Sequence, residues 1–187
     1  MGDLLERVGH RRAETIRRMV GAGVNCPRAS SAGRLFDAVA ALLGLCDDAS
    51  YEGEAAVLLE AAARRCAETT VPSLRWDLRR RGGLWVYDHA STLADATDGP
   101  LETVALRFHH TLVEVTLAMV TEAAREHGVA TVCLGGGVFQ NGLLSAALLR
   151  QLAEQDLDVH IGRMVPVNDG GISYGQAAVA AARMSRG

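Results

Sequence analysis

The sequence has 187 residues, 49% of them hydrophobic and 22% charged, which is enough for one domain with a hydrophobic core and excludes the disordered class. The net charge is −3 and the basic residues are scattered, so the composition gives no sign of a nucleic-acid-binding surface. All 19 basic residues are arginine, which excludes lysine Schiff-base chemistry and the phosphate-binding lysine of a P-loop.

The first 67 residues predict a helical subdomain. Residues 3–20 predict an arginine-rich amphipathic helix, and the N-terminal twenty residues contain no apolar run long enough for a signal peptide or a membrane span. The Ser30-Ser31 pair is a candidate N-cap for a helix over residues 32–45. A further alanine-rich helix is expected over about 52–66.

Residues 68–187 predict an α/β lobe. Helical and strand-like segments alternate along it, which favours parallel strand pairing. The expected order is a strand at 84–87, a helix at 101–127, a strand at 131–134, a glycine loop, a helix at 143–152, a strand at 159–161 and a closing helix at 172–184.

The strongest local motif is Gly135-Gly136-Gly137, placed between a predicted strand and a predicted helix. Glycines let the backbone approach a ligand closely, and a following helix N-terminus offers N–H groups to an anion. The motif is therefore typical of a phosphate-binding loop, although it is neither a P-loop nor a dinucleotide-binding turn. A tight strand-to-helix turn without a ligand explains the same glycines equally well.

The second motif is Asn168-Asp169-Gly170-Gly171, after the last predicted strand. Asp169 could bind a hard cation such as Mg²⁺ beside a phosphate, but the composition also suits an ordinary turn. The third motif places Asp37 one helical turn after Arg34. Either a surface ion pair or a contact with ribose hydroxyls explains Asp37, and the local pattern favours neither.

Cysteine and histidine spacing gives no zinc signature. The four cysteines form no Cys-x-x-Cys pair, and no two histidines are spaced for one helix face. Without a secretion signal the thiols are expected to be reduced, which favours a cytoplasmic protein with no membrane or nucleic-acid partner.

Four motifs together resemble, in order and spacing, the C-terminal part of the hydrogenase-maturation carbamoyltransferase (HypF) family. They are the segments 30–44, 50–56, 136–141 and 166–172, and the likeness extends from about residue 20 to 184. More distantly the sequence is similar to tRNA threonylcarbamoyl transferases, and through them to sugar kinases and actin-like ATPases.

The resemblance implies one lobe of an actin-like, sugar-kinase-like (RNase H-like) ATPase fold with a helical N-terminal subdomain. ATP or carbamoyl-adenylate would lie in a cleft between two lobes, with a divalent metal of the Mg or Fe/Zn type in the complete site. Asp169 is the implied metal ligand, and no catalytic residue is assigned. The implied nucleotide-binding residues are Gly135, Gly136 and Gly137 for phosphate, Asn141 for adenosine, and Asp37 and Gly53 for ribose.

The resemblance also implies an acceptor and a missing partner. In this family a carbamoyl group passes to a cysteine of a HypE-type protein during nickel–iron hydrogenase maturation. The family's histidine cluster belongs to the preceding lobe, and no His-His-x-x-His run occurs here. The chain is thus expected to need that N-terminal lobe, on the same or a separate chain, and to expose an apolar face that favours self-association. The alternatives are a non-catalytic nucleotide- or partner-binding module and a lobe of a small-molecule O-carbamoyltransferase.

Overall fold

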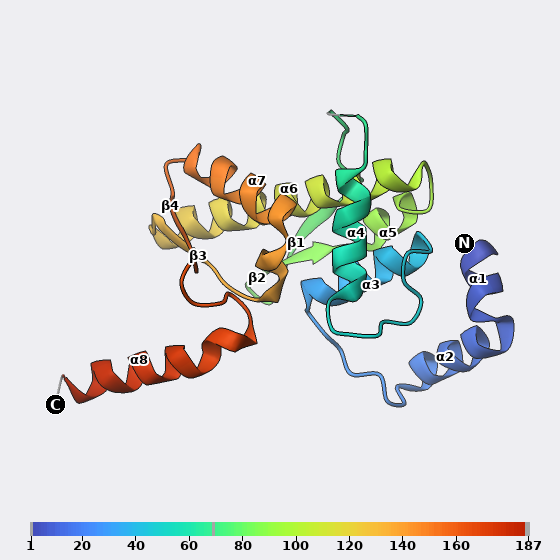
Figure 1. Ribbon diagram of the computed structural model, residues 1–187, viewed down its shortest axis with the longest axis horizontal. Helices are drawn as coiled ribbons and strands as arrows, with labels where there is room; N and C mark the ends of the chain where they lie inside the picture. The colour runs from blue at the N-terminus through green and yellow to red at the C-terminus, as the bar shows by residue number, and fades with distance from the viewer. Residues whose placement is uncertain (1, 69, 186–187) are drawn as a thin grey trace. The chain divides into compact units, whose positions relative to one another are not determined.

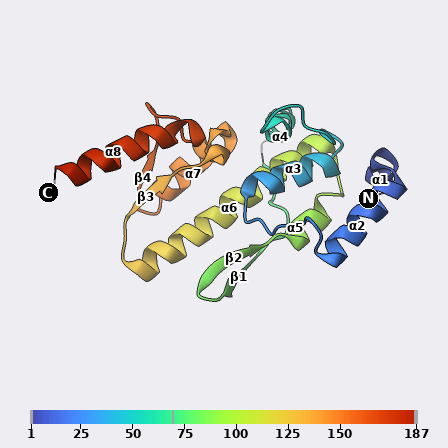
Figure 2. The same cartoon turned by 90° about the horizontal axis from the view of Figure 1, so that it is seen from below.

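The chain folds into two compact units in a computed structural model that describes residues 2–68 and 70–185 (Figures 1 and 2). The first unit contains the residues up to Asp77 together with Asp88–His109. The second contains Leu78–Tyr87 and the residues from His110 onward. The long helix α6 contributes its first nine residues to the first unit and the remainder to the second.

The first unit is helical. Its helices are α1 (Gly2–Val8), α2 (His10–Ala22), α3 (Ala32–Leu42), α4 (Glu54–Arg64), α5 (Ala90–Asp95) and the start of α6 (Leu101–His127).

Two glycines with positive φ explain where the N-terminal helices end. Gly9, at φ +86°, separates α1 from α2, so the expected single amphipathic helix is two helices. Gly44, at φ +71°, lies just past the end of α3, which therefore stops before the expected residue 45. Ser31 is the N-cap residue of α3, as predicted, but its side chain makes no capping hydrogen bond.

The core of the first unit is formed where α3, α4 and the start of α6 meet. Phe36 and Phe108 are fully buried and pack edge to face, with ring centroids 5.1 Å apart. His109 is also buried, lies 5.5 Å from the Phe36 ring and has its Nδ1 2.8 Å from the Ala105 carbonyl oxygen. His109 therefore belongs to the core of the first unit.

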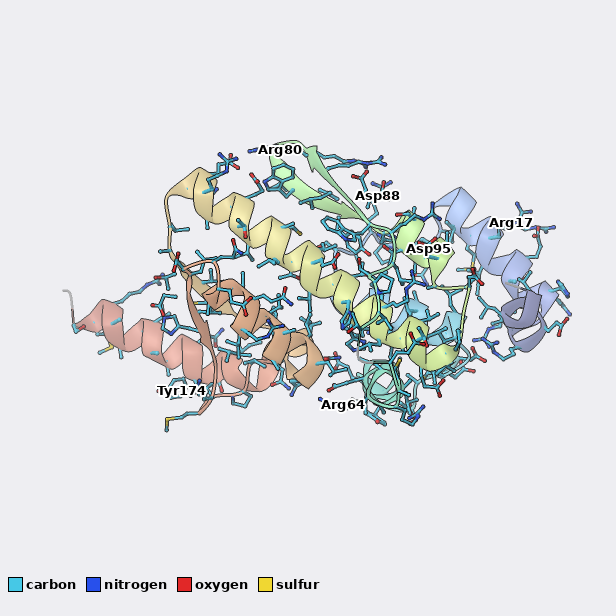
Figure 3. The ribbon with its side chains drawn as sticks, turned by 90° about the horizontal axis from the view of Figure 1, so that it is seen from above. Arg17, Arg64, Arg80, Asp88, Asp95 and Tyr174 are labelled. Carbon is cyan, nitrogen blue, oxygen red and sulfur yellow. The ribbon has the colours of Figure 1, made fainter. Side chains whose placement is uncertain are left out.

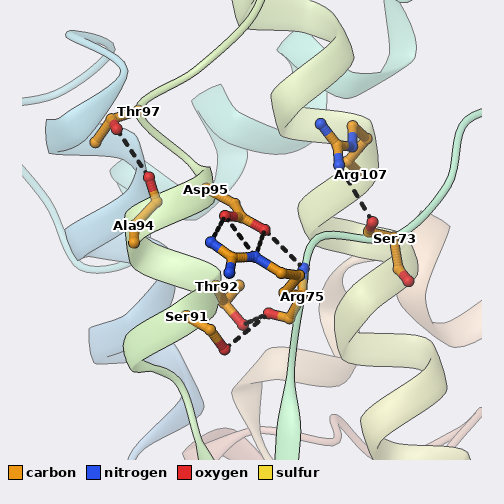
Figure 4. Close-up of polar contacts among 8 residues, drawn as sticks. All are labelled: Ser73, Arg75, Ser91, Thr92, Ala94, Asp95, Thr97 and Arg107. Atoms are coloured by element: carbon orange, nitrogen blue, oxygen red, sulfur yellow. Dashed lines mark hydrogen bonds and ion pairs between the residues drawn. The ribbon is translucent and has the colours of Figure 1, made fainter.

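An ion pair fixes the segment before β1 against α5 (Figure 4). Arg75 donates from Nε and Nη2 to the Asp95 carboxylate at 3.0 and 2.5 Å, and this guanidinium lowers the pKa of Asp95. Ser91 and Thr92 donate to the Arg75 carbonyl oxygen, at 3.2 and 2.7 Å. Arg107 of α6 donates to the Ser73 carbonyl oxygen at 3.3 Å. These contacts are structural, and they hold an extended segment that has no regular hydrogen-bonded partner strand.

The second unit begins with a two-stranded hairpin, β1 (Asp77–Arg81) and β2 (Leu84–Asp88). Gly82 and Gly83 both have positive φ, as a two-residue type I′ turn requires. Arg80 of β1 pairs with Glu126 of α6 at 2.5 Å and lies over the Trp85 ring, 5.4 Å from its centroid (Figure 3).

The rest of the second unit is a parallel strand pair covered by a helix. Its elements are β3 (Thr131–Leu134), the short 3-10 helix η1 (Gly137–Gln140), α7 (Gly142–Ala153), β4 (Asp158–Ile161), a second 3-10 turn η2 (Asp169–Gly171) and α8 (Ile172–Met184). The strands pair in parallel, with Val132 opposite Val159 and Leu134 opposite Ile161, and these residues form the more buried face. Helix α7 contacts β4 and buries Leu144, Leu148 and Leu152.

The division into units differs from the boundary at residue 67. Residues 70–77 and 88–109 fold with the helical segment because α5 and the start of α6 pack there, through contacts such as Arg75–Asp95 and Phe36–Phe108. The predicted boundary at residue 67 separates a helical part of the sequence from a part with both helices and strands. The two compact units are divided at other residues.

Candidate functional site

Two loops meet at the carboxyl end of the parallel strand pair. Gly136 follows β3 and donates its backbone N–H to the Val167 carbonyl oxygen at 2.6 Å, after β4. A β-carbon on Gly137 would lie 3.9 Å from the β-carbon of Asn168. The loops adjoin because parallel strands end at the same sheet edge, which is where α/β folds place their ligands. The glycine motif and the Asn-Asp-Gly-Gly motif therefore form one feature.

The glycine loop has an open surface. A β-carbon built on Gly135 or on Gly136 would meet no atom within 4 Å, so neither glycine is required by packing inside the chain. Gly136 has φ +110° and ψ 155°, a conformation that favours glycine whatever the surrounding space. Gly135 does not have a positive φ, so neither its backbone conformation nor packing requires a glycine there. A loop of this kind fits a ligand that approaches the backbone closely.

Asn141 follows the loop and the η1 turn in the chain and is 7% exposed. Its side-chain oxygen accepts the backbone N–H of Leu144 at 3.0 Å, so Asn141 is the N-cap of α7. The Ser145 hydroxyl also donates to the Phe139 carbonyl oxygen at 2.6 Å. These bonds fix the exit of the loop.

The start of α7 differs from the expectation that the loop leads directly into a helix N-terminus. The 3-10 turn η1 lies between the loop and α7, and the Leu144 N–H is taken by Asn141 rather than offered to an anion. The physical reason is that an N-cap side chain satisfies the same N–H groups that an anion would use.

Asp169 is exposed and begins the η2 turn. The turn is held by Asn168, whose side-chain oxygen accepts the Gly170 N–H at 3.1 Å. The two glycines that follow have a packing role that the sequence did not indicate. A β-carbon on Gly170 would lie 3.1 Å from the Asn168 side-chain oxygen, and one on Gly171 would collide with the Pro166 carbonyl oxygen.

Asp169 supplies one carboxylate, and a single carboxylate binds a divalent ion only weakly because such ions need several oxygen ligands. Among the side chains that the structure describes, no three from His, Cys, Asp or Glu are close enough together to hold a metal. Asp169 is therefore not part of a cluster of three such ligands within the described residues.

Asp37 and Gly53 belong to the first unit, whereas the two loops belong to the second. Asp37, on α3, has a half-buried side chain and pairs with Arg34 at 3.0 Å, so the ion pair considered for this position is present. Gly53, at φ +87°, is the N-cap residue of α4, and a β-carbon there would meet no atom within 4 Å. Helices α3 and α4 pack together, which brings the two ribose candidates onto one helical pair.

An acidic neighbourhood accompanies this pair. Burial raises the pKa of the Cys46 thiol, and the charges of Glu54, Asp37, Asp47 and Asp48 raise it further. Glu54 accepts hydrogen bonds from the backbone and the hydroxyl of Ser50, at 2.5 and 2.8 Å, which lowers the pKa of Glu54. Neither Glu54 nor Ser50 was a predicted site residue. The sequence signal for their contact was a serine placed four residues before a glutamate at the start of a predicted helix.

The parallel strand pair, the adjoining loops at its carboxyl ends and the covering helix α7 form an α/β lobe, and the similar solved structures assign it to the actin-like, RNase H-like class. A crystal structure of full-length HypF in the phosphate- and nucleotide-bound form matches 96% of this chain with a TM-score of 0.86 and 32% identity. This chain covers 24% of that protein.

The sequence comparisons identify the family. The profile of the carbamoyltransferase Kae1-like domain, second subdomain, matches residues 2–176. A carbamoyltransferase HypF homolog of Cupriavidus necator is 39% identical in an alignment of 184 residues that covers 93% of this chain and 46% of that protein. Carbamoyltransferase HypF of Rhodobacter capsulatus is 40% identical in an alignment of 187 residues that covers 98% of this chain and 24% of that protein. The chain therefore belongs to the HypF carbamoyltransferase family, as the second subdomain of its Kae1-like domain, and spans less than half of these relatives.

Proposed function

We propose that this chain is the nucleotide-binding second subdomain of a HypF-type carbamoyltransferase, with ATP or carbamoyl-adenylate as the ligand of its glycine loop. The observation that carries the proposal is the open surface over Gly135 and Gly136, at the carboxyl edge of a parallel strand pair. The phosphate- and nucleotide-bound state named for the similar HypF structure supports this choice of ligand.

The chemistry expected of the loop is electrostatic. Backbone N–H groups around a phosphate stabilise its negative charge without any covalent step, and they need no reorganisation when the ligand binds. The N–H of Gly136 is already committed to Val167, so we assign phosphate binding to the neighbouring backbone of Gly135 and Gly137. Asn141 then acts by positioning the loop through its cap of α7, and its contact with adenosine stays a prediction.

The remaining assignments follow the same scheme. Asp37 and Gly53 are proposed to face the ribose, and Asp169 to contribute one ligand to a divalent metal in the complete protein. A bound metal would neutralise part of the phosphate charge. The carbamoyl group is proposed to pass from carbamoyl-adenylate to a cysteine thiolate of a HypE-type acceptor protein, with AMP as the leaving group. Orientation of the reactants and exclusion of water are assigned to the complete two-lobed site, of which this lobe is one wall.

The cell compartment is proposed to be the cytoplasm. Cys26, Cys46, Cys66 and Cys133 are all free thiols. No helix in the described part of the chain is both long and apolar enough to cross a membrane.

Calorimetric titration of ATP, ADP and AMP into the chain, with and without Mg²⁺, tests the proposal. Binding that strengthens with the number of phosphates is expected, because the loop is assigned to phosphate. Equal affinity for the three nucleotides would contradict this assignment. Absence of binding both in this chain and in its complex with the missing first subdomain would overturn nucleotide binding by this lobe.

The second candidate is a non-catalytic nucleotide- or partner-binding module, in which the loops at the carboxyl edge of the strand pair hold a nucleotide without chemistry. Nucleotide binding without carbamoyl transfer in the reconstituted complex would support this module over the enzyme.

A further inference from the structure

Residues 162–167, which we call the β4 loop, follow the last strand and run beside the glycine loop. Strands β3 and β4 end together, because Leu134 lies opposite Ile161 in the parallel register (Figure 1). The next residues along the two strands are Gly135 and Gly162. Paired strands lie about 5 Å apart, so the two loops begin as close neighbours.

The β4 loop makes a sharp turn and then returns to the glycine loop. A β-carbon on Gly162 would lie 2.7 Å from the Val165 carbonyl oxygen, so the turn there is tight enough to require glycine. The loop ends at Val167, whose carbonyl oxygen accepts the Gly136 N–H at 2.6 Å. Arg163 lies in the turn between these two points and is exposed. Arg163 is therefore carried by a short loop that both begins and ends beside the glycine loop.

The charges of the two loops make Arg163 the available cation. Residues 135–141 contain no charged side chain, and residues 162–171 contain only Arg163 and Asp169. The carboxylate of Asp169 repels a phosphate that has no metal between them. The lysine that binds phosphate in a P-loop has no counterpart in this sequence, which lacks lysine altogether. A phosphate chain at the glycine loop therefore needs a positive charge, and Arg163 is the residue of these loops that supplies one.

Arg163 is also free of competing ion pairs. Arg80, Arg125 and Arg150 of the second unit each pair with a glutamate. No carboxylate among the described residues forms such a pair with Arg163. A planar guanidinium can donate two parallel hydrogen bonds to phosphate oxygens. Arg163 can do so without first breaking a bond inside the chain.

We infer that Arg163 binds the phosphate chain of the nucleotide, an inference that rests on the proposed function. Its guanidinium donates to phosphate oxygens that the backbone of Gly135 and Gly137 approaches from the other loop. The attraction between charges grows with the number of phosphate charges, so this contact favours ATP over AMP. Because the charge belongs to the side chain, the contact acts without Mg²⁺ as well as with it.

The test is calorimetric titration of adenosine, AMP, ADP, ATP and inorganic triphosphate without Mg²⁺. It uses this complete chain, and its complex with the part of the C. necator relative that lies outside the matched region. Arg163→Met should weaken binding of ATP and of inorganic triphosphate about tenfold or more, because charge-assisted hydrogen bonds are lost. Its affinity for adenosine should stay unchanged. Arg163→Lys keeps the charge and should retain more of the ATP affinity than Arg163→Met.

Arg183→Met is the matched control. Arg183, on α8, also forms no ion pair with a described carboxylate, and it lies outside both loops. Its removal changes the net charge by the same amount and should leave ATP affinity within about twofold, since a distant exposed charge is screened. The denaturation midpoints of both methionine variants should match that of the parent chain, because both side chains are exposed.

Several outcomes would overturn the inference. They are ATP binding by Arg163→Met as strong as by the parent chain, an equal loss in Arg183→Met, and an equal loss of adenosine and ATP affinity in Arg163→Met. The last result would make Arg163 a structural residue of the β4 loop.

The outcomes also separate this inference from the proposed function. Full ATP binding by Arg163→Met, together with lost binding by Gly135→Val, would reject the role of Arg163 and retain the nucleotide-binding loop. Absence of ATP binding by the parent complex would overturn both.

Discussion

Gly135 is the position at which a substitution tests whether a ligand approaches the backbone of the glycine loop. Its β-carbon position is open and its φ is not positive, so Gly135→Val adds bulk above the loop without backbone strain. We expect this variant to lose nucleotide binding in calorimetry while its denaturation midpoint stays unchanged. Normal binding by Gly135→Val would show that the loop is a turn without a ligand.

Gly136 gives the contrasting variant. At φ +110° a valine is strained, and the cost is expected to be about 1–3 kcal/mol of unfolding free energy. Loss of binding by Gly136→Val would therefore accompany a loss of stability, measurable by urea denaturation. A stable Gly136→Val protein would contradict the conformational argument.

Asp169 is exposed, and the hydrogen bond that holds its turn comes from Asn168. We expect Asp169→Ala to leave the melting temperature nearly unchanged and to remove any Mg²⁺ dependence of nucleotide binding. Asn168→Ala, the matched control, should lower the melting temperature because it removes the bond to the Gly170 N–H. Unfolding of Asp169→Ala would make Asp169 a structural turn residue.

Cys46 reports on the acidic neighbourhood of α3 and α4. Burial and the nearby carboxylates raise the pKa of this thiol, so less thiolate is present at a given pH than for an ordinary cysteine. Iodoacetamide should label Cys46 more slowly than the exposed Cys26 near neutral pH, and its rate should rise as the pH passes through the raised pKa. Mass spectrometry gives both rates, and Glu54→Gln should accelerate labelling of Cys46. Equal rates for both thiols would contradict a raised pKa of Cys46.

At the scale of elements, the N-cap residue Asn141 joins the end of the glycine loop to α7, which packs against β4. Asn141→Ala removes the acceptor of the Leu144 N–H and should cost about 1 kcal/mol of unfolding free energy, measured by urea denaturation. Asn141→Asp keeps the capping oxygen and should retain the stability. If Asn141→Asp nevertheless loses adenosine affinity, the amide contacts the base directly. If it binds normally, Asn141 acts only through the cap.

At the scale of the whole molecule, one lobe cannot enclose the reacting groups. We expect the isolated chain to show no carbamoyl transfer from carbamoyl-adenylate to a thiol acceptor, because an open site neither excludes water nor orients both reactants. The complex with the remainder of the C. necator relative is the positive arm of the same assay. Enzyme-dependent product from the isolated chain would show that the second subdomain is sufficient.

Local sequence determined the elements and the family. The bounds of α6, β3 and α8 follow from periodicity and from the residues at their ends, and the predicted parallel pairing of the strands is present. Four motifs with correct order and spacing sufficed for the family, which the profile match over residues 2–176 confirms. These features depend on residues near one another in the chain, so the sequence alone reveals them.

Tertiary structure decided what the individual motif residues do. Three contacts illustrate this point, because no local sequence pattern predicts them. They are the hydrogen bond from Gly136 to Val167, the contact that leaves no room for a β-carbon on Gly171, and the ion pair between Arg75 and Asp95. The sequence could show that glycine occupies a position, but not whether the missing β-carbon leaves room for a ligand or for the chain itself. That distinction separates Gly135 from Gly171, and it depends on packing, which exists only once the segments have come together.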